Sequence, residues 1–220
     1  MPSRASRVVW PRVSFKDQLP DSSAARATAA AAASDTSRSS DPSFANTSSA
    51  ARVVPPGEAT RPTADRTRET LFAMLTSRLG SFEELEVADL FAGSGALGLE
   101  ALSRGAARCL FVENDAAAVR ALRANIAALR AQAQCDVNAG SVLSLGPAKA
   151  PLDLILLDPP YHSGAGGVAL DRLTRLGWIG DATWVALETA KDEPANVKTL
   201  EADTERKVGA ARLTLLRKRS

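Results

Sequence analysis

Residues 89–98 have the sequence Asp-Leu-Phe-Ala-Gly-Ser-Gly-Ala-Leu-Gly, which contains the pattern G-x-G-x-x-G. An apolar run at Val87–Phe91 precedes the glycines, and a helical stretch at Ala96–Arg104 follows them. Glycines between a strand and a helix let the backbone approach a ligand closely and leave the helix N-terminus open to an anion. The segment therefore predicts a nucleotide-binding loop in an α/β sheet.

The alternation of short apolar runs and helical stretches continues on both sides of this loop. Further strands are predicted at residues 109–112, 136–139, 152–157 and 184–187, and helices at residues 63–79, 116–129 and 168–176. Thr63 is the expected N-cap of the first helix. Residues 197–200 and 211–216 are predicted to close the sheet as an antiparallel hairpin. Together these elements predict a doubly wound α/β sheet of seven strands, with ligands at the carboxyl ends of the parallel strands.

The composition excludes several classes of function. The chain has 220 residues, 45% of them hydrophobic and 24% charged, and a net charge of only +2, which argues against a broad nucleic-acid-coating surface. Two cysteines and one histidine cannot form a disulfide framework or a zinc site of four such ligands, so no metal is expected. No apolar run approaches the roughly 20 residues of a membrane span, and we expect a soluble, cytoplasmic protein.

The first 51 residues differ from the rest of the chain. Most positions between Ser22 and Ala51 are Ser, Ala or Thr, and they show no repeating apolar face. Such a stretch buries too little apolar surface to offset the entropy of ordering. We therefore expect residues 1–51 to be a disordered extension or a misassigned start, and residues 52–220 to form the functional domain.

Two carboxylates help to distinguish the possible ligands of the glycine loop. Glu113 ends the next predicted strand, twenty positions after Gly93, where a carboxylate would hold the ribose hydroxyls of a dinucleotide or of S-adenosylmethionine. Asp89 lies just before the loop, where it would suit a cationic amino acid group and would be unfavourable beside an anionic pyrophosphate. S-adenosylmethionine is therefore favoured, and a dinucleotide oxidoreductase is the weaker alternative.

A second motif, Asp158-Pro159-Pro160-Tyr161, follows the aliphatic run at residues 152–157. The Asp158 carboxylate and the Pro159 carbonyl could each accept one N–H of an exocyclic amine, which would localise the nitrogen lone pair toward a methyl donor. Neither proline has an N–H, so the segment cannot coil into a helix and its carbonyls stay available. Tyr161 could stack on a base. The alternative is a strand end with a stiff diproline turn and a packing tyrosine.

The order and spacing of these motifs resemble those of the bacterial 16S rRNA guanine-N2 methyltransferases, the RsmD family. The most discriminating part is the block Arg61-Pro62-Thr63-Ala64-Asp65-Arg66-Thr67-Arg68-Glu69, and the likeness extends from about Val53 to Arg217. It implies a Rossmann-like class I methyltransferase sheet, S-adenosylmethionine as cofactor, and 16S rRNA as partner, within the small ribosomal subunit or its assembly intermediate. We expect a monomer. The basic strand pair that usually opens the family is here replaced by the Ser/Ala-rich stretch.

The resemblance also implies roles for individual residues. Cofactor binding is expected at Asp89, Phe91, Gly93, Ser94, Gly95, Glu113, Asn114 and Ser141. Substrate binding is expected at Arg61, Thr63, Arg66, Arg68 and Tyr161, and the target amine at Asp158, Pro159, Pro160 and Tyr161. For the arginines the alternative is a solvated, salt-paired helix face, and for Asn114 it is a part in helix capping.

Other functions stay open on the residues alone. The amine could belong to adenine N6 in DNA or to a protein glutamine, although Asp rather than Asn at position 158 favours guanine. A non-catalytic RNA-binding or assembly factor that keeps a cofactor pocket is the alternative from another class. The presence of both Asp158 and Tyr161 argues against that alternative.

Overall fold

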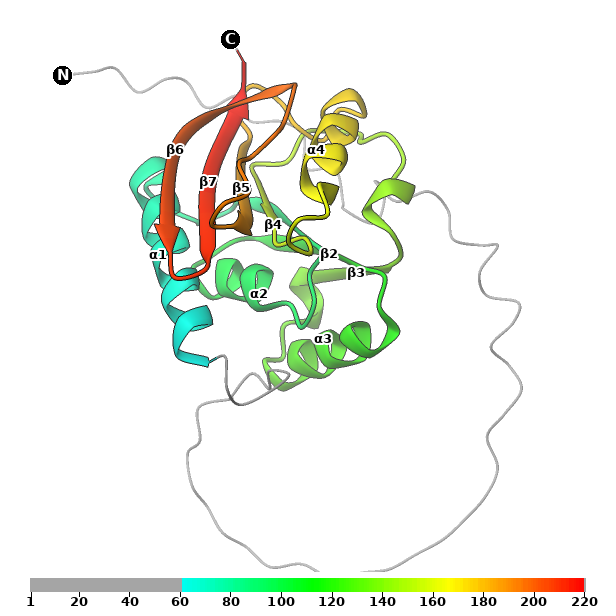
Figure 1. The fold of residues 1–220 in the computed structure, drawn as a ribbon. Helices are drawn as coiled ribbons and strands as arrows, with labels where there is room; N and C mark the ends of the chain where they lie inside the picture. Colours follow the sequence, from blue (N-terminus) through cyan, green and yellow to red (C-terminus); the bar gives the residue numbers. More distant parts are fainter. Residues whose placement is uncertain (1–60, 220) are drawn as a thin grey trace, which may run out of the picture.

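The computed structural model describes residues 61–219, in which seven strands form one mixed sheet. The strand order is β3-β2-β1-β4-β5-β7-β6, with β6 and β7 antiparallel to their neighbours and the other strands parallel (Figure 1). The strands are β1 (Glu86–Leu90), β2 (Arg108–Glu113), β3 (Cys135–Ala139), β4 (Leu154–Leu157), β5 (Trp184–Ala190), β6 (Leu200–Val208) and β7 (Ala211–Lys218). The order reverses between β1 and β4, so these two strands open the crevice in which such sheets bind ligands.

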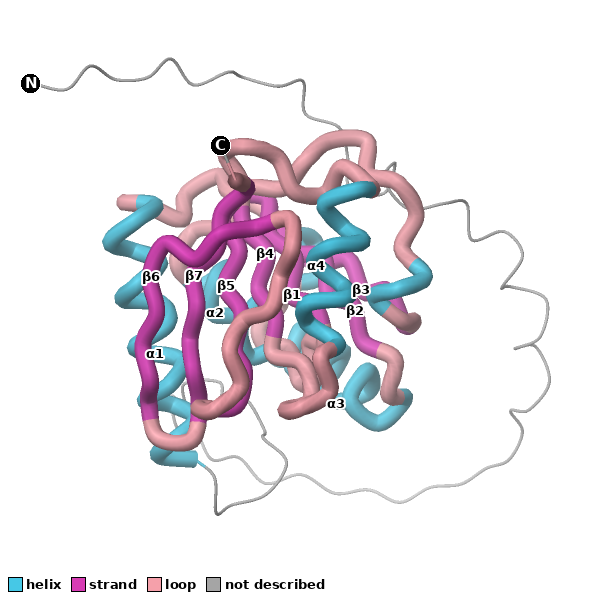
Figure 2. The backbone as a smooth tube through the Cα atoms, turned by 45° about the horizontal axis from the view of Figure 1, so that its top comes forward, coloured by secondary structure: helices cyan, strands magenta, loops and turns pink. Residues whose placement is uncertain are grey.

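Helices cover the sheet on both faces (Figure 2). They are α1 (Arg61–Leu79), α2 (Ala96–Ser103), α3 (Ala116–Ala128) and α4 (Ala165–Arg175), with single 3-10 turns η3 (Gln132–Gln134) and η4 (Val142–Ser144). Apolar side chains of α1, α2 and α3 join one core cluster, and those of α4 join the other. Both views place the start of α1 at the same end of the sheet as the β6–β7 turn.

The central strand shows why the sequence folds in this way. In β4 every side chain is buried, because Leu154 and Leu156 pack under α1–α3 while Ile155 and Leu157 pack under α4. A strand covered on both faces needs a continuous aliphatic run, which is what Leu154–Leu157 supplies. The predicted doubly wound sheet with a C-terminal hairpin is confirmed.

Two local predictions are wrong. Helix α1 begins at Arg61, so Thr63 lies inside its first turn and does not cap it. Pro62 is tolerated there because the first N–H groups of a helix have no intrahelical acceptor. The first strand of the hairpin is Leu200–Val208 and not Val197–Leu200. The sequence pattern does not indicate this strand, because it is an edge strand whose side chains are largely exposed and form no apolar run.

The expectation for residues 1–51 lies outside the described residues. Among those that are described, no helix combines the length and the apolarity that crossing a membrane requires.

Candidate active site

Four carboxylates line the carboxyl ends of neighbouring strands. Asp89 on β1 pairs in register with Phe111 on β2 and Leu156 on β4, and Leu156 pairs with Ala186 on β5. Paired residues of parallel strands share a face, and side chains two positions apart do so as well. The face that carries Asp89 therefore also carries Glu113, Asp158 and Glu188. We call these four residues the carboxylate row.

Asp89 lies beneath the glycine loop and is 1% exposed. Its Oδ2 accepts the backbone N–H of Gly98 at 2.8 Å. Burial raises the pKa of Asp89 to about 8, the Gly98 bond opposes the rise, and the charges of Asp158 and Glu113 add to it. A cation in the crevice would relieve this crowding of negative charge.

Glu113 joins the glycine loop to the turn before α3. Its Oε2 accepts the N–H of Gly93, and its Oε1 accepts the N–H groups of Asn114 and Asp115, all at 2.8 Å. Asp115 caps α3 by accepting the N–H of Ala118 at 2.7 Å. Glu113, which is predicted to bind the ribose hydroxyls, is thus fixed by three backbone N–H donors. Asn114 lies exposed on the same turn.

The glycines of the loop have different surroundings. A Cβ on Gly98 would press against the Phe111 ring and lie 2.6 Å from Cys109 Sγ, so this glycine allows α2 to pack on β2. Gly93 has a φ of 54°, and a Cβ there would meet no protein atom within 4 Å. Phe91, just before it, also has a positive φ, of 60°. The open side of the loop therefore lies at Gly93, where the backbone is exposed to an incoming ligand.

The loop is fixed on its other side by α3. Asn125, which is buried, donates its Nδ2 hydrogen to the carbonyl of Ser94 at 3.0 Å. Gly95, with a φ of 85°, packs against Leu122 of the same helix. These contacts hold the predicted cofactor residues Ser94 and Gly95 in place before any ligand binds.

Asp158 follows β4 and differs from Asp89 in its contacts. The residue is exposed, and its carboxylate accepts no hydrogen bond from any residue in the range 61–219. Protein atoms nevertheless surround the carboxyl group closely enough to weaken its hydration, which, together with the charge of Glu188, raises the pKa of Asp158 to about 7.

The two prolines after Asp158 offer different carbonyls. The Pro160 carbonyl accepts the Ser163 hydroxyl. The Pro159 carbonyl accepts no hydrogen bond within the described part of the chain. The Asp158 carboxylate and the carbonyl of the buried Pro159, on adjacent residues at the end of β4, therefore both lack a hydrogen-bond partner within the described residues. Their role as acceptors of an amine stays a prediction.

Tyr161 is anchored by a residue that the sequence analysis missed. Its hydroxyl donates to Oε1 of Glu188 on β5 at 2.8 Å. Burial raises the pKa of Tyr161, and the Glu188 hydrogen bond and charge add to this. The pKa of Glu188 is also raised by burial, while the Tyr161 bond opposes the rise. Tyr161 as a residue stays 42% exposed. Alternation along β5, beginning at the buried Ala186, could have indicated Glu188.

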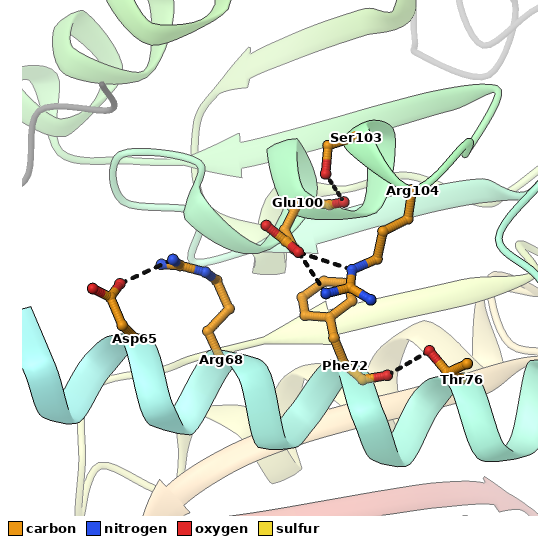
Figure 3. A network of polar contacts seen from close by, with 7 residues as sticks. All are labelled: Asp65, Arg68, Phe72, Thr76, Glu100, Ser103 and Arg104. Carbon is orange, nitrogen blue, oxygen red and sulfur yellow. Dashed lines mark hydrogen bonds and ion pairs between the residues drawn. The ribbon is translucent and has the colours of Figure 1, made fainter. Parts of the chain in front are cut away.

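The remaining predicted residues come from the segment after β3 and from α1. Ser141 follows β3 and accepts the N–H of Leu143 at 3.2 Å. Arg66 is exposed on α1, and Arg68 forms an ion pair with Asp65 at 2.9 Å (Figure 3). The side chains of Arg61 and Thr63 lie outside the described residues.

Figure 3 also shows how α1 is attached to the end of α2. Arg104, which follows α2, pairs with Glu100 at 2.7 Å and stacks over the Phe72 ring of α1, with 4.8 Å between its guanidinium carbon and the ring centroid. This contact joins α1 to the helix that begins at the loop. That the basic start of α1 borders the site stays a prediction.

Comparison with known proteins decides the family. A family model described as conserved hypothetical protein 95 matches residues 51–217. The chain belongs to this family. The ribosomal RNA small subunit methyltransferase D of Escherichia coli K12 is 38% identical over 136 residues, which cover 62% of this chain and 67% of the relative.

Solved structures agree with this membership. An Escherichia coli protein provisionally classed as a methyltransferase matches with a TM-score of 0.63 and 31% identity, covering 73% of this chain and 89% of that one. A Haemophilus influenzae protein provisionally classed as a methylase matches with a TM-score of 0.61 and 32% identity, covering 72% and 100%. The resemblance to the RsmD family and the prediction of a methyltransferase are confirmed.

Proposed function

We propose that this enzyme methylates the exocyclic N2 of a guanine in small-subunit ribosomal RNA, with S-adenosylmethionine as donor. The observation that carries the proposal is a pair of adjacent acceptors without a hydrogen-bond partner in the described chain, the Asp158 carboxylate of the carboxylate row and the Pro159 carbonyl. The relatives named as rRNA small subunit methyltransferases supply the class of substrate.

The donor set suits S-adenosylmethionine. The cofactor carries a sulfonium and an ammonium group, and the carboxylate row is a set of four acids whose crowding favours a cationic ligand. Glu113, fixed by three backbone donors, keeps lone pairs that can accept ribose hydroxyls. Gly93 leaves the backbone open to the ligand. When bound, the cofactor supplies an electrophilic methyl group whose bonding electrons return to sulfur.

Asp158 and Pro159 act on the amine. The nitrogen of an exocyclic amine is a poor nucleophile because its lone pair is delocalised into the ring. Two acceptors that take both N–H hydrogens favour a pyramidal nitrogen, so that the lone pair is withdrawn from the ring π system and is localised for attack. As the new N–C bond forms, the nitrogen becomes strongly acidic and releases one proton to the Asp158 carboxylate or to water. Tyr161 supports the base with its exposed ring.

The carboxylate at position 158 favours guanine over adenine. Guanine presents N1–H and N2–H on the same edge, and a carboxylate with two acceptor oxygens can take a hydrogen from each. Adenine presents an acceptor at N1, which would meet the carboxylate lone pairs and be repelled. The target base would have to leave its stack to reach the crevice. We further propose that the enzyme acts as a cytoplasmic monomer on small-subunit particles or their assembly intermediates.

The test is methyl transfer from labelled S-adenosylmethionine to small ribosomal particles that lack the modification, followed by nucleoside analysis. Label in N2-methylguanosine is the expected result. Asp158→Ala should remove the label while the dissociation constant of the cofactor changes by less than tenfold. Asp181→Ala is the matched control, because Asp181 is an exposed acid whose partner is Lys218 at 2.8 Å. Label in N6-methyladenosine or in protein would overturn the proposed substrate.

A further inference from the structure

A hollow of about 540 Å³ lies beside the amine site. It is lined by Tyr161, His162, Ala190, Lys191, Asp192, Lys207 and Ala210. Its walls come from the loop after β4, the loop after β5 and the end of the β6–β7 hairpin. Tyr161 belongs to both sites, because its hydroxyl bonds Glu188 of the carboxylate row while its side chain lines the hollow. The hollow therefore begins where the proposed base site ends.

The walls of the hollow are fixed to one another. The backbone N–H of Lys191 donates to the Ala210 carbonyl at 2.8 Å, and the Lys191 carbonyl accepts the guanidinium of Arg212 at 2.9 Å. Across the hollow, the N–H of His162 donates to Oε2 of Glu193 at 2.7 Å. His162 has a φ of 57°, a strained conformation that the surrounding contacts must hold. The loops thus present their side chains from anchored backbone positions.

Some charged groups at the hollow have an ion-pair partner and others have none. Arg212 is neutralised by Glu205, whose two oxygens each lie 2.9 Å from Nη1. The ammonium groups of Lys191 and Lys207 have no hydrogen-bond or ion-pair partner within residues 61–219. Asp192 is the acid of the lining, and its carboxylate lies 3.8 Å from His162 Nε2. Two lysines that line the same hollow, one after β5 and one on β6, are suited to bind an anion there.

We propose that this hollow is a second RNA subsite, in which Lys191 and Lys207 hold a backbone phosphate of a nucleotide next to the methylated base. The inference rests on the proposed function, because it takes the nucleic acid substrate from it. If the target base stacks on Tyr161 in the crevice, the RNA backbone attached to that base would lie on the outer side of the Tyr161 ring. The hollow adjoins this outer side. Phosphate contacts of this kind position the RNA and do not select its sequence.

The test compares Lys191→Met, Lys207→Met and the double variant with wild type in binding to an unmodified 16S rRNA transcript. Methionine keeps most of the apolar stem and removes the charge. The logarithm of the affinity falls as the logarithm of the salt concentration rises. Each lost phosphate contact should make this slope shallower by about 0.7 for single-stranded RNA. The KM for RNA should rise about three- to tenfold in each single variant, while kcat and the KM for the cofactor stay unchanged.

Lys149→Met is the matched control, because Lys149 is exposed and precedes β4, at the opposite end of the strands. Its salt slope should equal that of wild type. If the hollow variants also keep the wild-type slope while wild type methylates RNA, the subsite is refuted and the proposed function stands. If the slopes fall but no RNA is methylated, the subsite stands and the proposed function fails. A wild-type protein that does not bind the transcript refutes both.

Discussion

Asp89 and Asp158 occupy equivalent positions in the sheet but have opposite surroundings. Both lie at the carboxyl ends of the adjacent parallel strands β1 and β4, on the same face of the sheet. Asp89 is 1% exposed and bonded to the Gly98 N–H, whereas Asp158 is exposed and bonded to no described residue. One carboxylate is part of the scaffold beneath the glycine loop. The other is the acceptor that we propose for the substrate amine.

The same difference separates the two halves of the site. On the side of β1 and β2, the side chains of Glu113, Asp89 and Asn125 are bonded to backbone groups of the protein itself, so the loop has its shape before a ligand arrives. On the side of β4 and β5, the Asp158 carboxylate and the Pro159 carbonyl have no hydrogen-bond partner in the described chain, while Tyr161 is fixed by Glu188. A preformed loop on one side and acceptors without protein partners on the other would suit the proposed transfer from a bound donor to an incoming base.

The comparison is tested most strongly by the pH dependence of stability. Burial raises the pKa of Asp89 to about 8 from an unfolded value of 3.8, so the folded state binds more protons between these values. The free energy of unfolding should therefore fall by up to about 5 kcal/mol as pH rises from 4 to 8. Asp89→Asn keeps an acceptor for Gly98 and should abolish this contribution. Denaturant titrations at pH 4.5, 6 and 8 measure it; parallel curves for both proteins would show that Asp89 is not buried as described.

Asp158→Asn should affect activity and leave folding intact. The amide offers one acceptor oxygen in place of two and turns a donor toward the amine, so kcat should fall about 100- to 1000-fold, or about 2.7–4 kcal/mol. In wild type the acceptor must be ionised. Since the pKa of Asp158 is raised to about 7, single-turnover rates should fall about tenfold per pH unit below that value. A flat profile between pH 5.5 and 8 would contradict the role of the carboxylate.

Two glycine substitutions should separate packing from binding within the cofactor loop. Gly98→Ala places a methyl group against Phe111 and Cys109 and should lower the free energy of unfolding by roughly 1–3 kcal/mol. Gly93→Ala meets no protein atom, and its left-handed φ should cost about 1 kcal/mol. The larger effect of Gly93→Ala should be on cofactor affinity, measured by calorimetry. Equal affinity losses in the two variants would remove the distinction between them.

How far the sequence predicts this site depends on which signal each residue carries. The sheet, the glycine loop and Asp158-Pro159-Pro160-Tyr161 were predictable, because apolar runs, glycine spacing and diproline motifs are local patterns. The edge strand Leu200–Val208 was not, since its side chains face solvent and show no apolar run. Nor could spacing show that Glu113 bonds three backbone N–H groups or that the Pro159 carbonyl is free while the Pro160 carbonyl is bonded. Such pairings depend on loop conformations that only the folded chain defines.

Glu188 provides the test with the smallest expected effect, because it links the carboxylate row to Tyr161. Glu188→Gln keeps an acceptor for the Tyr161 hydroxyl and removes the charge that raises the pKa of Asp158. The acid limb of the pH–rate profile should therefore move to lower pH, while kcat at pH 8 stays within about threefold of wild type. Glu188→Ala also releases the ring, and the KM for RNA should rise about three- to tenfold, or about 0.6–1.4 kcal/mol. Suppose instead that Glu188→Gln raises the KM for RNA as much as Glu188→Ala does and leaves the acid limb of the pH–rate profile in place. Neither the charge of Glu188 nor its hydrogen bond to Tyr161 would then matter, and Glu188 would act by packing alone.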